Sequence, residues 1–456
     1  MSNTGFHHHA GPHLDDARFR RSHDAGALGE AIVRTLMAGY TGPVAIRLWD
    51  GRFASGAADA PVQLVFREPR ALRELILSGG NLLRLGEAYL SGAIDVEGDM
   101  ERVFGLADHL QAHQPDLRHR LALLYQALRL PSGRHASQGG EQRLSRRRVR
   151  RNGREAIAHH YDVGNEFYRL WLDPEMVYSC AYFRDDDQSL AGAQRDKLDY
   201  LCRKLRLRPG QSLLDIGCGW GALVLWAARR YGVRAHGITL SEAQYRHARE
   251  RIRAEGLQDR VTVELRDYRD LADEARYDRV VSVGMFEHIG VTNFPAYFGT
   301  IRRVLRPGGL FLNHGITSDS GWRRTPLTRF VNRYVFPDGE LARVSDVGDA
   351  MERAGFELLD VESLRRHYAR TLRHWVQALE AAREQAVAVS SEAVWRLWRL
   401  YMAGSAWYFE QGSINVYQIL AGHSGHTPPV PLRRDDLYLA HGGEFGTTAT
   451  RTGEHA

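Results

Sequence analysis

The apolar and polar positions divide the chain into two folded parts. Residues 44–51 alternate apolar and polar side chains as a strand does, and residues 62–66 form a second strand candidate that a helical pattern follows. Another helical stretch runs from residue 106 to residue 130, where Pro115 should break it in two. These patterns predict a small α+β domain over residues 28–130.

A longer alternation of strands and helices begins near residue 155. A helix-like stretch at residues 160–172 and a helix over residues 189–205 come first, and apolar runs with strand character then alternate with helical segments. The strand candidates are residues 212–217, 234–240, 261–267, 277–286 and 310–316. Strands and helices at this spacing predict an α/β domain with a doubly wound parallel sheet, whose ligand lies beyond the carboxyl ends of the strands. We place this domain at residues 155–430.

The segments outside the two domains are polar. Residues 131–154 are a linker by composition, and residues 143–154 include seven arginines. Such a run is usually a solvated, flexible segment, but it would also suit contact with anionic lipid head groups or with nucleic acid. Residues 1–27 and 431–456 are expected to be tails. The first tail contains histidines that would bind metal only adventitiously: His7, His8, His9 and His13.

Composition excludes several classes of protein. The chain has 456 residues, of which 43% are hydrophobic and 25% charged, so it is not disordered, collagen-like or a disulfide scaffold. Its formal net charge is +6, and all basic residues except Lys197 and Lys204 are arginine. Arginine suits partners that carry phosphate or carboxylate. With three cysteines, no signal-peptide pattern and no apolar run of about 18 residues, we expect a reducing compartment and no membrane span.

The tightest local motif lies at residues 213–226. A buried strand delivers Asp215, and glycines at 217, 219 and 221 turn the chain into a helix. Glycine lets the backbone approach a ligand closely, and a helix N-terminus offers N–H groups to an anion. The spacing matches neither the dinucleotide fingerprint nor a phosphate-binding loop. The sequence DIGCGWG instead resembles the glycine motif of the class I S-adenosylmethionine-dependent methyltransferases.

This resemblance implies a Rossmann-like domain with S-adenosylmethionine as methyl donor. Many members carry an acidic residue near the end of the second strand, where this chain has Thr239 and Gln244, a departure that points to one branch of the fold. By the same resemblance, Asp267 and Tyr268 would lie beside the adenine. The residues expected to bind the cofactor are Tyr178, Ser179, Asp215, Gly217, Gly219, Trp220, Thr239, Gln244, Asp267 and Tyr268.

Further segments resemble the cyclopropane-fatty-acyl-phospholipid synthases, over roughly residues 80–420. They are NLLRLGEAYLSGAIDVEGD (81–99), HYDVGNEFYRLWLDPEMVYSCAYF (160–183), VSVGMFEHIG (281–290), LRPGGLFLNHGI (305–316) and VNRYVFPDGEL (331–341). The first is similar to the N-terminal domain of longer bacterial members, which implies an accessory lipid-binding or regulatory domain. The family transfers the methyl carbon of S-adenosylmethionine to the cis double bond of an unsaturated phospholipid acyl chain and closes a cyclopropane ring.

The resemblance also implies a bound bicarbonate ion, which accepts a proton from the transferred methyl group before the ring closes. Its expected site consists of Cys180, Glu287, His314, the backbone of Ile316, and Tyr368. Glu287 would accept a hydrogen bond from the bicarbonate hydroxyl, with His314 and Tyr368 as donors. Asn313 stands where an apolar residue is expected before the histidine, so the neighbouring contacts should differ.

The same residues have structural interpretations. Cys180 would suit a core, Tyr368 a cap on a surface helix, and His314 a purely structural position. Glu287 and His288 are adjacent but lack any metal-ligand spacing, so we expect no metal.

Aromatic residues in 331–341 and 393–420 would line an acyl tunnel or lid, or else form helix-packing core or a dimer contact. The oligomeric state, including a homodimer, stays open. The expected partner is an unsaturated phospholipid, which the protein would reach by peripheral contact with the inner, cytoplasmic face of the cell membrane.

Three other activities compete with ring formation. On the same fold, loss of a different proton would give a methylene-branched acyl chain, the precursor of a methyl branch. A lipid-binding module with a dead cofactor site would have lost Asp215, Gly217 or Glu287, and all three are present. Nucleic-acid methylation predicts a motif such as Asn-Pro-Pro-Tyr after the fourth strand, where this chain has Met-Phe-Glu-His, so we expect no nucleic-acid partner.

Overall fold

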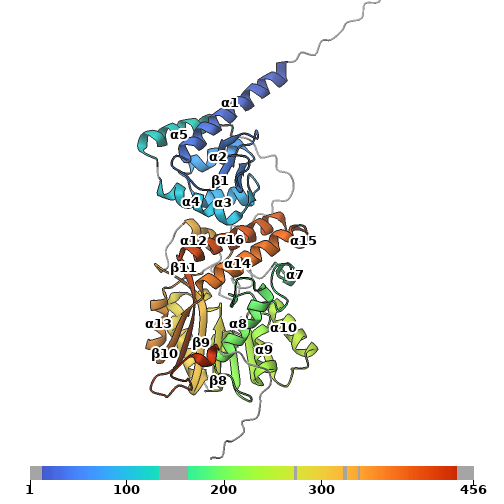
Figure 1. The fold of residues 1–456 in the computed structure, drawn as a ribbon, viewed down its shortest axis with the longest axis vertical. Coiled ribbons are helices and arrows are strands. Elements are labelled where there is room, and N and C mark those ends of the chain that lie inside the picture. Colours follow the sequence, from blue (N-terminus) through green and yellow to red (C-terminus); the bar gives the residue numbers. More distant parts are fainter. Residues whose placement is uncertain are drawn as a thin grey trace, which may run out of the picture.

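In the computed structural model, two domains are stacked along the long axis of the molecule (Figure 1). The structure describes residues 13–113, 115–132, 163–271, 275–321, 326–336 and 339–438. The arginine run at 143–154 and the histidines at 7–9 lie outside these ranges, and so do the contacts predicted for them. No helix in the described ranges is both long and apolar enough to cross a membrane.

The N-terminal domain is built on a four-stranded sheet. Its spatial order is β2 (Phe53–Ser55), β1 (Val44–Arg47), β3 (Val62–Phe66) and β4 (Ile94–Gly98). The two central strands are parallel, and each edge strand is antiparallel to its neighbour. The helices of this domain are α1 (His13–Leu36), α2 (Pro69–Leu77), α3 (Leu82–Leu90), α4 (Val103–Ala112) and α5 (Leu117–Arg129). The predicted α+β domain is confirmed, with the two predicted strands at its centre.

Two boundaries in this domain follow from local sequence. Pro115 lies between α4 and α5, as predicted, because proline lacks the N–H that a helix interior requires. Helix α1 begins at His13, so residues 13–27, which the polar composition assigned to a flexible tail, are helical. Arginine and alanine are frequent in this stretch and are good helix formers, which polarity alone does not reveal.

The C-terminal domain contains a seven-stranded sheet in the order β10–β11–β9–β8–β5–β6–β7. The strands are β5 (Ser212–Ile216), β6 (Arg234–Thr239), β7 (Val261–Leu265), β8 (Tyr277–Val283), β9 (Leu305–Ser318), β10 (Phe356–Ser363) and β11 (Ile414–His423). Strands β5 to β9 are parallel, as predicted, and β11 runs antiparallel between β9 and β10. The strand order reverses at β5, which is the switch point where open α/β sheets bind ligands.

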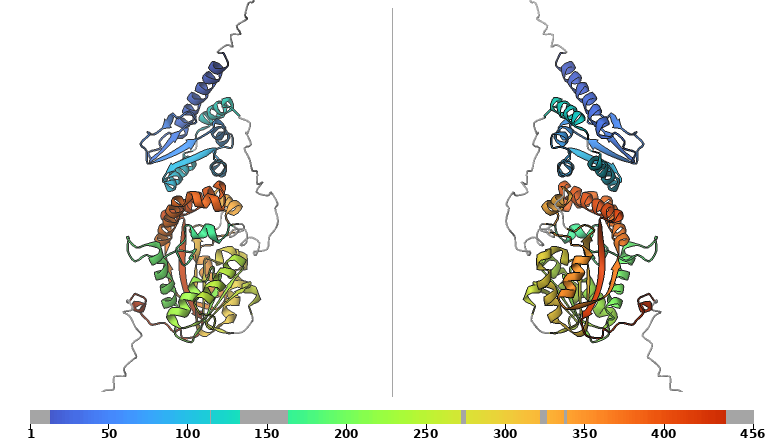
Figure 2. Two further views of the ribbon diagram at one scale, coloured as in Figure 1. Left: turned by 90° about the vertical axis from the view of Figure 1, so that its right-hand side faces the viewer. Right: turned by 90° about the vertical axis from the view of Figure 1, so that its left-hand side faces the viewer.

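Helices cover both faces of this sheet. One face packs against α8 (Leu190–Lys204), α9 (Ala222–Tyr231) and α10 (Glu242–Ala254), and the other against α11 (Phe294–Val304) and α13 (Val344–Arg353). A third group lies at the end of the sheet that faces the N-terminal domain (Figures 1 and 2): α7 (Asn165–Arg169), α12 (Pro326–Tyr334), α14 (Arg365–Ala381), α15 (Arg383–Val389) and α16 (Glu392–Gln411). The predicted Rossmann-like domain with helical additions is confirmed.

Caps fix where the helices beside the strand ends begin. Ser189 accepts a hydrogen bond from the N–H of Gly192 at the start of α8, and Ser241 accepts one from the N–H of Gln244 at the start of α10. Gly221 is the N-cap of α9, and glycine adopts its φ of 87° at little cost. The chain therefore turns sharply after β5 and β6, directly beside the switch point.

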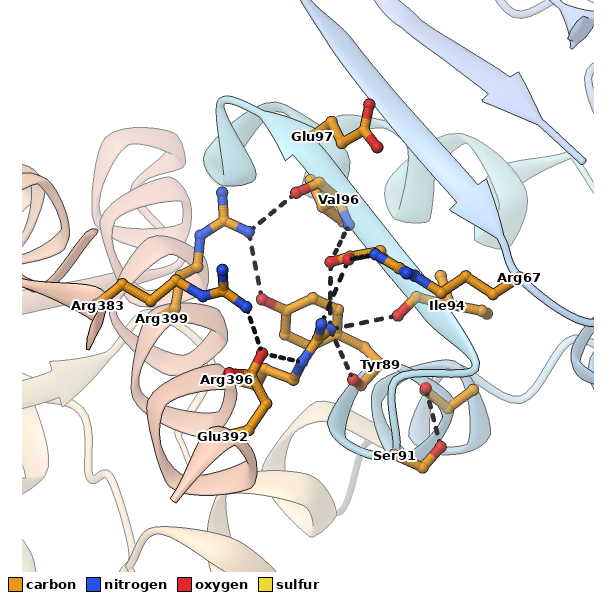
Figure 3. Close-up of polar contacts among 12 residues, drawn as sticks. Arg67, Tyr89, Ser91, Ile94, Val96, Glu97, Arg383, Glu392, Arg396 and Arg399 are labelled. Carbon is orange, nitrogen blue, oxygen red and sulfur yellow. Dashed lines mark hydrogen bonds and ion pairs between the residues drawn. The ribbon is translucent and has the colours of Figure 1, made fainter. Parts of the chain in front are cut away.

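Two arginines of α16 hold the domains together (Figure 3). Arg396 pairs with both carboxylate oxygens of Asp95, at 3.2 and 3.3 Å. Arg399 donates to the carbonyl oxygens of Val96 and Gly98, at 3.1 and 3.0 Å. Each arginine side chain is only 7% exposed, so these contacts are shielded from water. Because buried carbonyl groups without donors are costly, the contacts fix how the N-terminal domain sits on α16.

Replacing Arg399 by leucine should weaken the docking of the domains by roughly 2–4 kcal/mol, because the carbonyls of Val96 and Gly98 would stay buried without a donor. Differential scanning calorimetry of the full chain should show the N-terminal domain unfolding at a lower temperature than in the native chain. Arg373→Leu is the matched control, since its pair with Glu101 is more exposed and should be worth less than about 1 kcal/mol. A melting profile of Arg399→Leu that matches the control would contradict this assignment.

Candidate active site

A cavity of about 460 Å³ lies beyond the carboxyl ends of β5, β6 and β8. All of the residues predicted to bind the cofactor line it: Tyr178, Ser179, Asp215, Gly217, Gly219, Trp220, Thr239, Gln244, Asp267 and Tyr268. Gly217 has a φ of 83°, and a Cβ there would lie 3.0 Å from Cγ of Met285, so conformation and space both require glycine. The fold thus brings four separate segments to one cavity.

Two buried ionisable side chains, Asp215 and Lys197, line this cavity, and the sequence analysis did not predict the lysine. Burial raises the pKa of Asp215 to about 7 against the opposing charge of Lys197, and its Oδ1 has no hydrogen-bond partner among the described residues. Lys197, on α8, donates from Nζ to Oγ of Ser179 at 2.9 Å. Burial lowers its pKa to about 8, although Asp173 and Asp215 favour the charged form. Lys197 therefore contacts one predicted cofactor residue and balances the charge of another.

Neighbouring side chains hold other predicted cofactor residues. Thr239, at the end of β6, donates from Oγ1 to Oε1 of Gln244 at 2.8 Å, and both side chains are buried. Asp267 accepts hydrogen bonds from Arg269, from Nε at 3.0 Å and from Nη2 at 2.7 Å. Because Arg269 also lines the cavity, a ligand there meets Asp267 as half of an ion pair rather than as an isolated carboxylate.

A second cavity, of about 550 Å³, adjoins the first. All five residues predicted for proton removal line it: Cys180, Glu287, His314, Ile316 and Tyr368. The two cavities share the residues Tyr178, Ser179, Gly284, His288 and Phe336. A group bound in one cavity therefore lies across a thin common wall from a group bound in the other.

Glu287 is a buried acid with one engaged oxygen. It lies in the 3-10 turn η3 (Phe286–His288), directly after β8, and its Oε1 accepts a 2.8 Å hydrogen bond from the N–H of Ile316. Oε2 has no partner among the described residues. Burial raises the pKa of Glu287 to about 7, and the N–H of Ile316 opposes that rise. The N–H of Ile316, predicted to face an ion, therefore donates to Glu287 here, because η3 brings the carboxylate against β9.

His314, on β9, is held as a neutral imidazole. Gln418, on the neighbouring strand β11, donates from Nε2 to Nδ1 of His314 at 3.1 Å, which leaves the ring proton on Nε2. That Nε2 has no partner in the described part of the chain, and the ring lines the second cavity. Burial, assisted by the charges of Lys197 and Lys204, lowers the pKa of His314 to about 3. His314 can therefore donate a hydrogen bond into the cavity at neutral pH.

The remaining members of the cluster make mostly apolar contacts. Cys180 is fully buried, and burial raises the pKa of its thiol far above the usual range, so it is not a thiolate at neutral pH. Tyr368, on α14, packs its ring 4.7 Å from that of Phe409 and lines the cavity instead of capping a surface helix. Asn313 is buried next to His314 on β9, and its side chain leaves the strand on the opposite face.

His288 belongs to the wall that the two cavities share. Its ring packs 5.1 Å from that of Phe336, and burial lowers its pKa to about 4, so it is neutral at physiological pH. The described residues contain no group of three or more His, Cys, Asp or Glu side chains arranged to hold a metal.

The N-terminal domain supplies one wall of the second cavity. Apolar side chains from α3 and α4 line it, among them Leu82, Leu85, Val103 and Phe104. This domain therefore shapes the second cavity, mostly with apolar side chains.

The aromatic residues of α16 divide between the roles that the sequence left open. Tyr401 and Tyr408 line the second cavity. Trp395 and Trp398 are buried in helix-packing core, and Trp407 donates from Nε1 to a carboxylate of the N-terminal domain at 2.9 Å. The packing interpretation holds for Trp395 and Trp398, while the acyl tunnel stays a prediction for the two tyrosines at the cavity.

Sequence reasoning missed Lys197 although the composition carried a signal. The chain has only two lysines among its 61 basic residues, and Lys197 and Lys204 are 2% and 0% exposed. A chain that uses arginine at nearly every basic position has kept lysine where a compact ammonium fits and a guanidinium does not. Gln418 gave no comparable signal, because it lies 104 residues from His314 in the chain.

Replacing Lys197 by methionine should weaken the binding of S-adenosylmethionine at least about tenfold, because Asp215 would lose its counter-charge and take up a proton near neutral pH. Isothermal titration calorimetry of the full chain measures this. Lys204→Met is the matched control: it removes the other buried lysine, which pairs with Glu362 away from the cavity, and should lower stability but keep the affinity. Equal affinities for the two variants would refute the role given to Lys197.

Comparisons with known proteins identify relatives over most of the chain. A family described as mycolic acid cyclopropane synthetase matches residues 148–419, and a domain of unknown function matches residues 31–113. A probable fatty acid methyltransferase of Pseudomonas putida is 43% identical over 87% of this chain and 96% of its own length. The cyclopropane-fatty-acyl-phospholipid synthase of Escherichia coli is 35% identical over 79% of this chain and 88% of its own.

Solved structures give the same result. The cyclopropane synthase MmaA2 from Mycobacterium tuberculosis is 36% identical, with a TM-score of 0.56 over 59% of this chain and 97% of that one. The mycolic acid cyclopropane synthase CmaA1, complexed with SAH and CTAB, is 35% identical, with a TM-score of 0.56 over 59% and 98%. The chain therefore belongs to the cyclopropane synthase family of S-adenosylmethionine-dependent methyltransferases.

Proposed function

We propose that this protein transfers the methyl carbon of S-adenosylmethionine to the cis double bond of a phospholipid acyl chain and closes a cyclopropane ring. The observation that carries this proposal is the wall shared by two cavities. One cavity is lined by the expected S-adenosylmethionine residues, and the other by apolar side chains and the five-residue cluster. The proposal includes peripheral contact with the inner face of the membrane, where the phospholipid lies.

The first cavity suits S-adenosylmethionine by its charges. Oδ1 of Asp215, which has no partner among the described residues, can accept a hydrogen bond from the ammonium of the methionine part. The N-terminus of α9, behind the glycine turn, offers N–H groups to its carboxylate. The side chains of Thr239 and Gln244 supply neutral groups for hydroxyls of the sugar. The relative CmaA1, solved with SAH, supports the same donor.

The second cavity suits a reaction that places positive charge on carbon. A cis alkene is a weak nucleophile, and its attack on the sulfonium methyl breaks the carbon–sulfur bond and leaves a cation on the acyl chain. The rings of Tyr178 and Tyr368 line this cavity, and aromatic faces attract cations. The surrounding apolar side chains exclude the water that would otherwise capture the cation.

Ring closure requires loss of a proton from the transferred methyl group. Oε2 of Glu287 and Nε2 of His314 are buried and unpartnered within the described residues, and both side chains line the second cavity, an acceptor and a donor that fit bicarbonate. Bicarbonate bound there would supply the base. The Glu287 carboxylate would orient its hydroxyl, while His314 and the Tyr368 hydroxyl would donate to its charged oxygens.

A branched product is the second candidate. The Pseudomonas putida relative is named a probable fatty acid methyltransferase, a name that does not specify a ring. If the cation lost a proton from a carbon of the acyl chain, the same site would yield a methylene branch, and a separate reduction would give a methyl branch.

Incubation with S-adenosylmethionine and vesicles of an unsaturated phospholipid should add one CH₂ to the acyl chain, measured by mass spectrometry of the released fatty acids. Proton NMR should then show the upfield signals of cyclopropane hydrogens, because the five-residue cluster favours loss of the methyl proton. Glu287→Ala is the control and should abolish the product. Vinyl signals of a methylene group would establish the branch, and no added mass with any lipid would overturn both candidates.

The rate of methyl transfer should rise with pH through about 7, because the Glu287 pKa lies there and a proton on Oε2 would turn the expected acceptor for the bicarbonate hydroxyl into a donor. Initial rates at fixed bicarbonate and saturating S-adenosylmethionine measure this profile. Glu287→Gln should be on the order of 100-fold slower and should lose the rising limb. If the rate of Glu287→Gln still rises with pH through about 7, the rise comes from the titration of another group, such as bicarbonate itself.

A further inference from the structure

Exposed apolar side chains are concentrated on α5. Of the large apolar side chains that are exposed in the described ranges, five lie on this one helix, between 37% and 72% exposed. They are Leu117, Leu121, Leu124, Tyr125 and Leu128, which we call the apolar stripe of α5. A contiguous group of this kind on a folded surface marks an interaction site, whereas scattered exposed residues need no explanation.

The stripe has no part in holding α5 to its own domain. A different face of the helix, with Leu123 and Ala127, is buried in the core of the N-terminal domain. The stripe residues follow one another at spacings of four, three, one and three, so they share one side of the helix. The helix lies on the side of its domain that is turned away from the catalytic domain (Figures 1 and 2). It therefore presents a second apolar face to the outside.

Arginines border the stripe. Arg118 and Arg129 are exposed on one edge, and the Arg129 guanidinium lies 5.8 Å from the centre of the Tyr125 ring. Arg120 is exposed on the other edge. Asp116 is the acidic residue nearby, and it caps the helix by accepting from the N–H of His119. An apolar face flanked by arginine is typical of helices that lie in a membrane interface.

A second copy of the chain fits this surface less well. The helix has 13 residues, which is shorter than two heptads and too short for a stable coiled coil. Five side chains cannot cover the roughly 800 Å² per partner that a stable interface buries. The flanking arginines would face like charges across a two-fold axis, whereas anionic lipid head groups would neutralise them. The sequence that follows residue 132 is polar and rich in arginine, so it does not suit packing over the apolar stripe either.

The stripe is connected to the proposed acyl cavity through α4, which precedes α5 in the chain. Gln111, near the end of α4, lines that cavity and is exposed. Leu117 follows six residues later, which limits the separation to about 22 Å. We propose that the apolar stripe of α5 inserts into the interface of an anionic phospholipid bilayer and so holds the N-terminal domain at the membrane. The proposal rests on the proposed function for its choice of lipid, but its test does not depend on turnover.

Sedimentation with vesicles of phosphatidylglycerol and phosphatidylethanolamine tests the surface directly on the full chain. The triple variant Leu121→Gln/Leu124→Gln/Leu128→Gln should bind at least about tenfold more weakly than the native chain. The matched control, Val361→Gln/Val389→Gln/Leu432→Gln, alters exposed apolar residues of the catalytic domain and should bind normally. Native binding should also weaken in high salt and on phosphatidylcholine vesicles. Equal binding of the two triple variants would overturn the proposal.

A fluorescent label separates insertion from other causes. The three native cysteines are buried, so a thiol reagent should label Leu124→Cys selectively. Its emission should shift to the blue with the anionic vesicles, while a label at Val389→Cys should not respond. Without vesicles, a blue shift that grows with protein concentration, together with a dimer in analytical ultracentrifugation, would assign the stripe to contact with a second copy. That result would refute the proposed membrane contact.

Turnover distinguishes this proposal from the proposed function. On a short-chain unsaturated phospholipid below its micellar concentration, the triple variant should methylate as fast as the native chain, because no bilayer has to be reached. If the native chain binds vesicles but methylates neither substrate, the proposed function fails and the membrane surface stands.

Discussion

The parallel pairing of β8 with β5 on one side and β9 on the other is the constraint on which both cavities depend. In this register Asp215 lies beside Val281, and Val283 lies beside His314. The three strands therefore end at the same edge of the sheet, and the segments that follow them converge there. A shift of one residue in either ladder would turn the side chains of that strand to the other face and would separate the carboxylate of the first cavity from the imidazole of the second.

Removal of water sets the protonation of this edge. Burial favours the neutral form of every ionisable group, and here it raises the pKa of the acids Asp215 and Glu287 while it lowers the pKa of His314. The result is a site whose hydrogen-bond acceptors and donors are held in place but carry little fixed charge. Such a site tolerates an apolar chain, and its unpaired atoms are satisfied when a small polar ligand arrives. The same dryness makes the N-terminal domain part of the catalytic unit, because without it the apolar wall of α16 would face solvent.

The cofactor side of the site could be predicted from sequence, because each of its segments carries a local motif and the strand order brings these motifs to one edge. Residues whose importance comes from distant pairing could not. Gln418 reaches His314 only because β11 inserts antiparallel between β9 and β10, and nothing in its own neighbourhood indicates that pairing. The roles of the aromatic residues of α16 were ambiguous because the helix is covered on several sides, so Trp398 in the core and Tyr401 at the cavity fit the same helical spacing. Residues 13–27 show the limit of composition, since a polar helix and a polar tail look alike until a helix is observed.

The burial of both lysines has a consequence for the chemistry of the surface. Every other cationic side chain of the protein is a guanidinium or an imidazole, so the folded chain offers water no lysine amine. Acetyl transfer, ubiquitin attachment and other modifications that begin with attack by a lysine side chain have no substrate on the native fold. Amine-directed cross-linkers and dyes would likewise leave the side chains untouched until the protein unfolds, which makes the two amines reporters of opening: Lys197 for the cofactor cavity and Lys204 for the contact of α8 with β10.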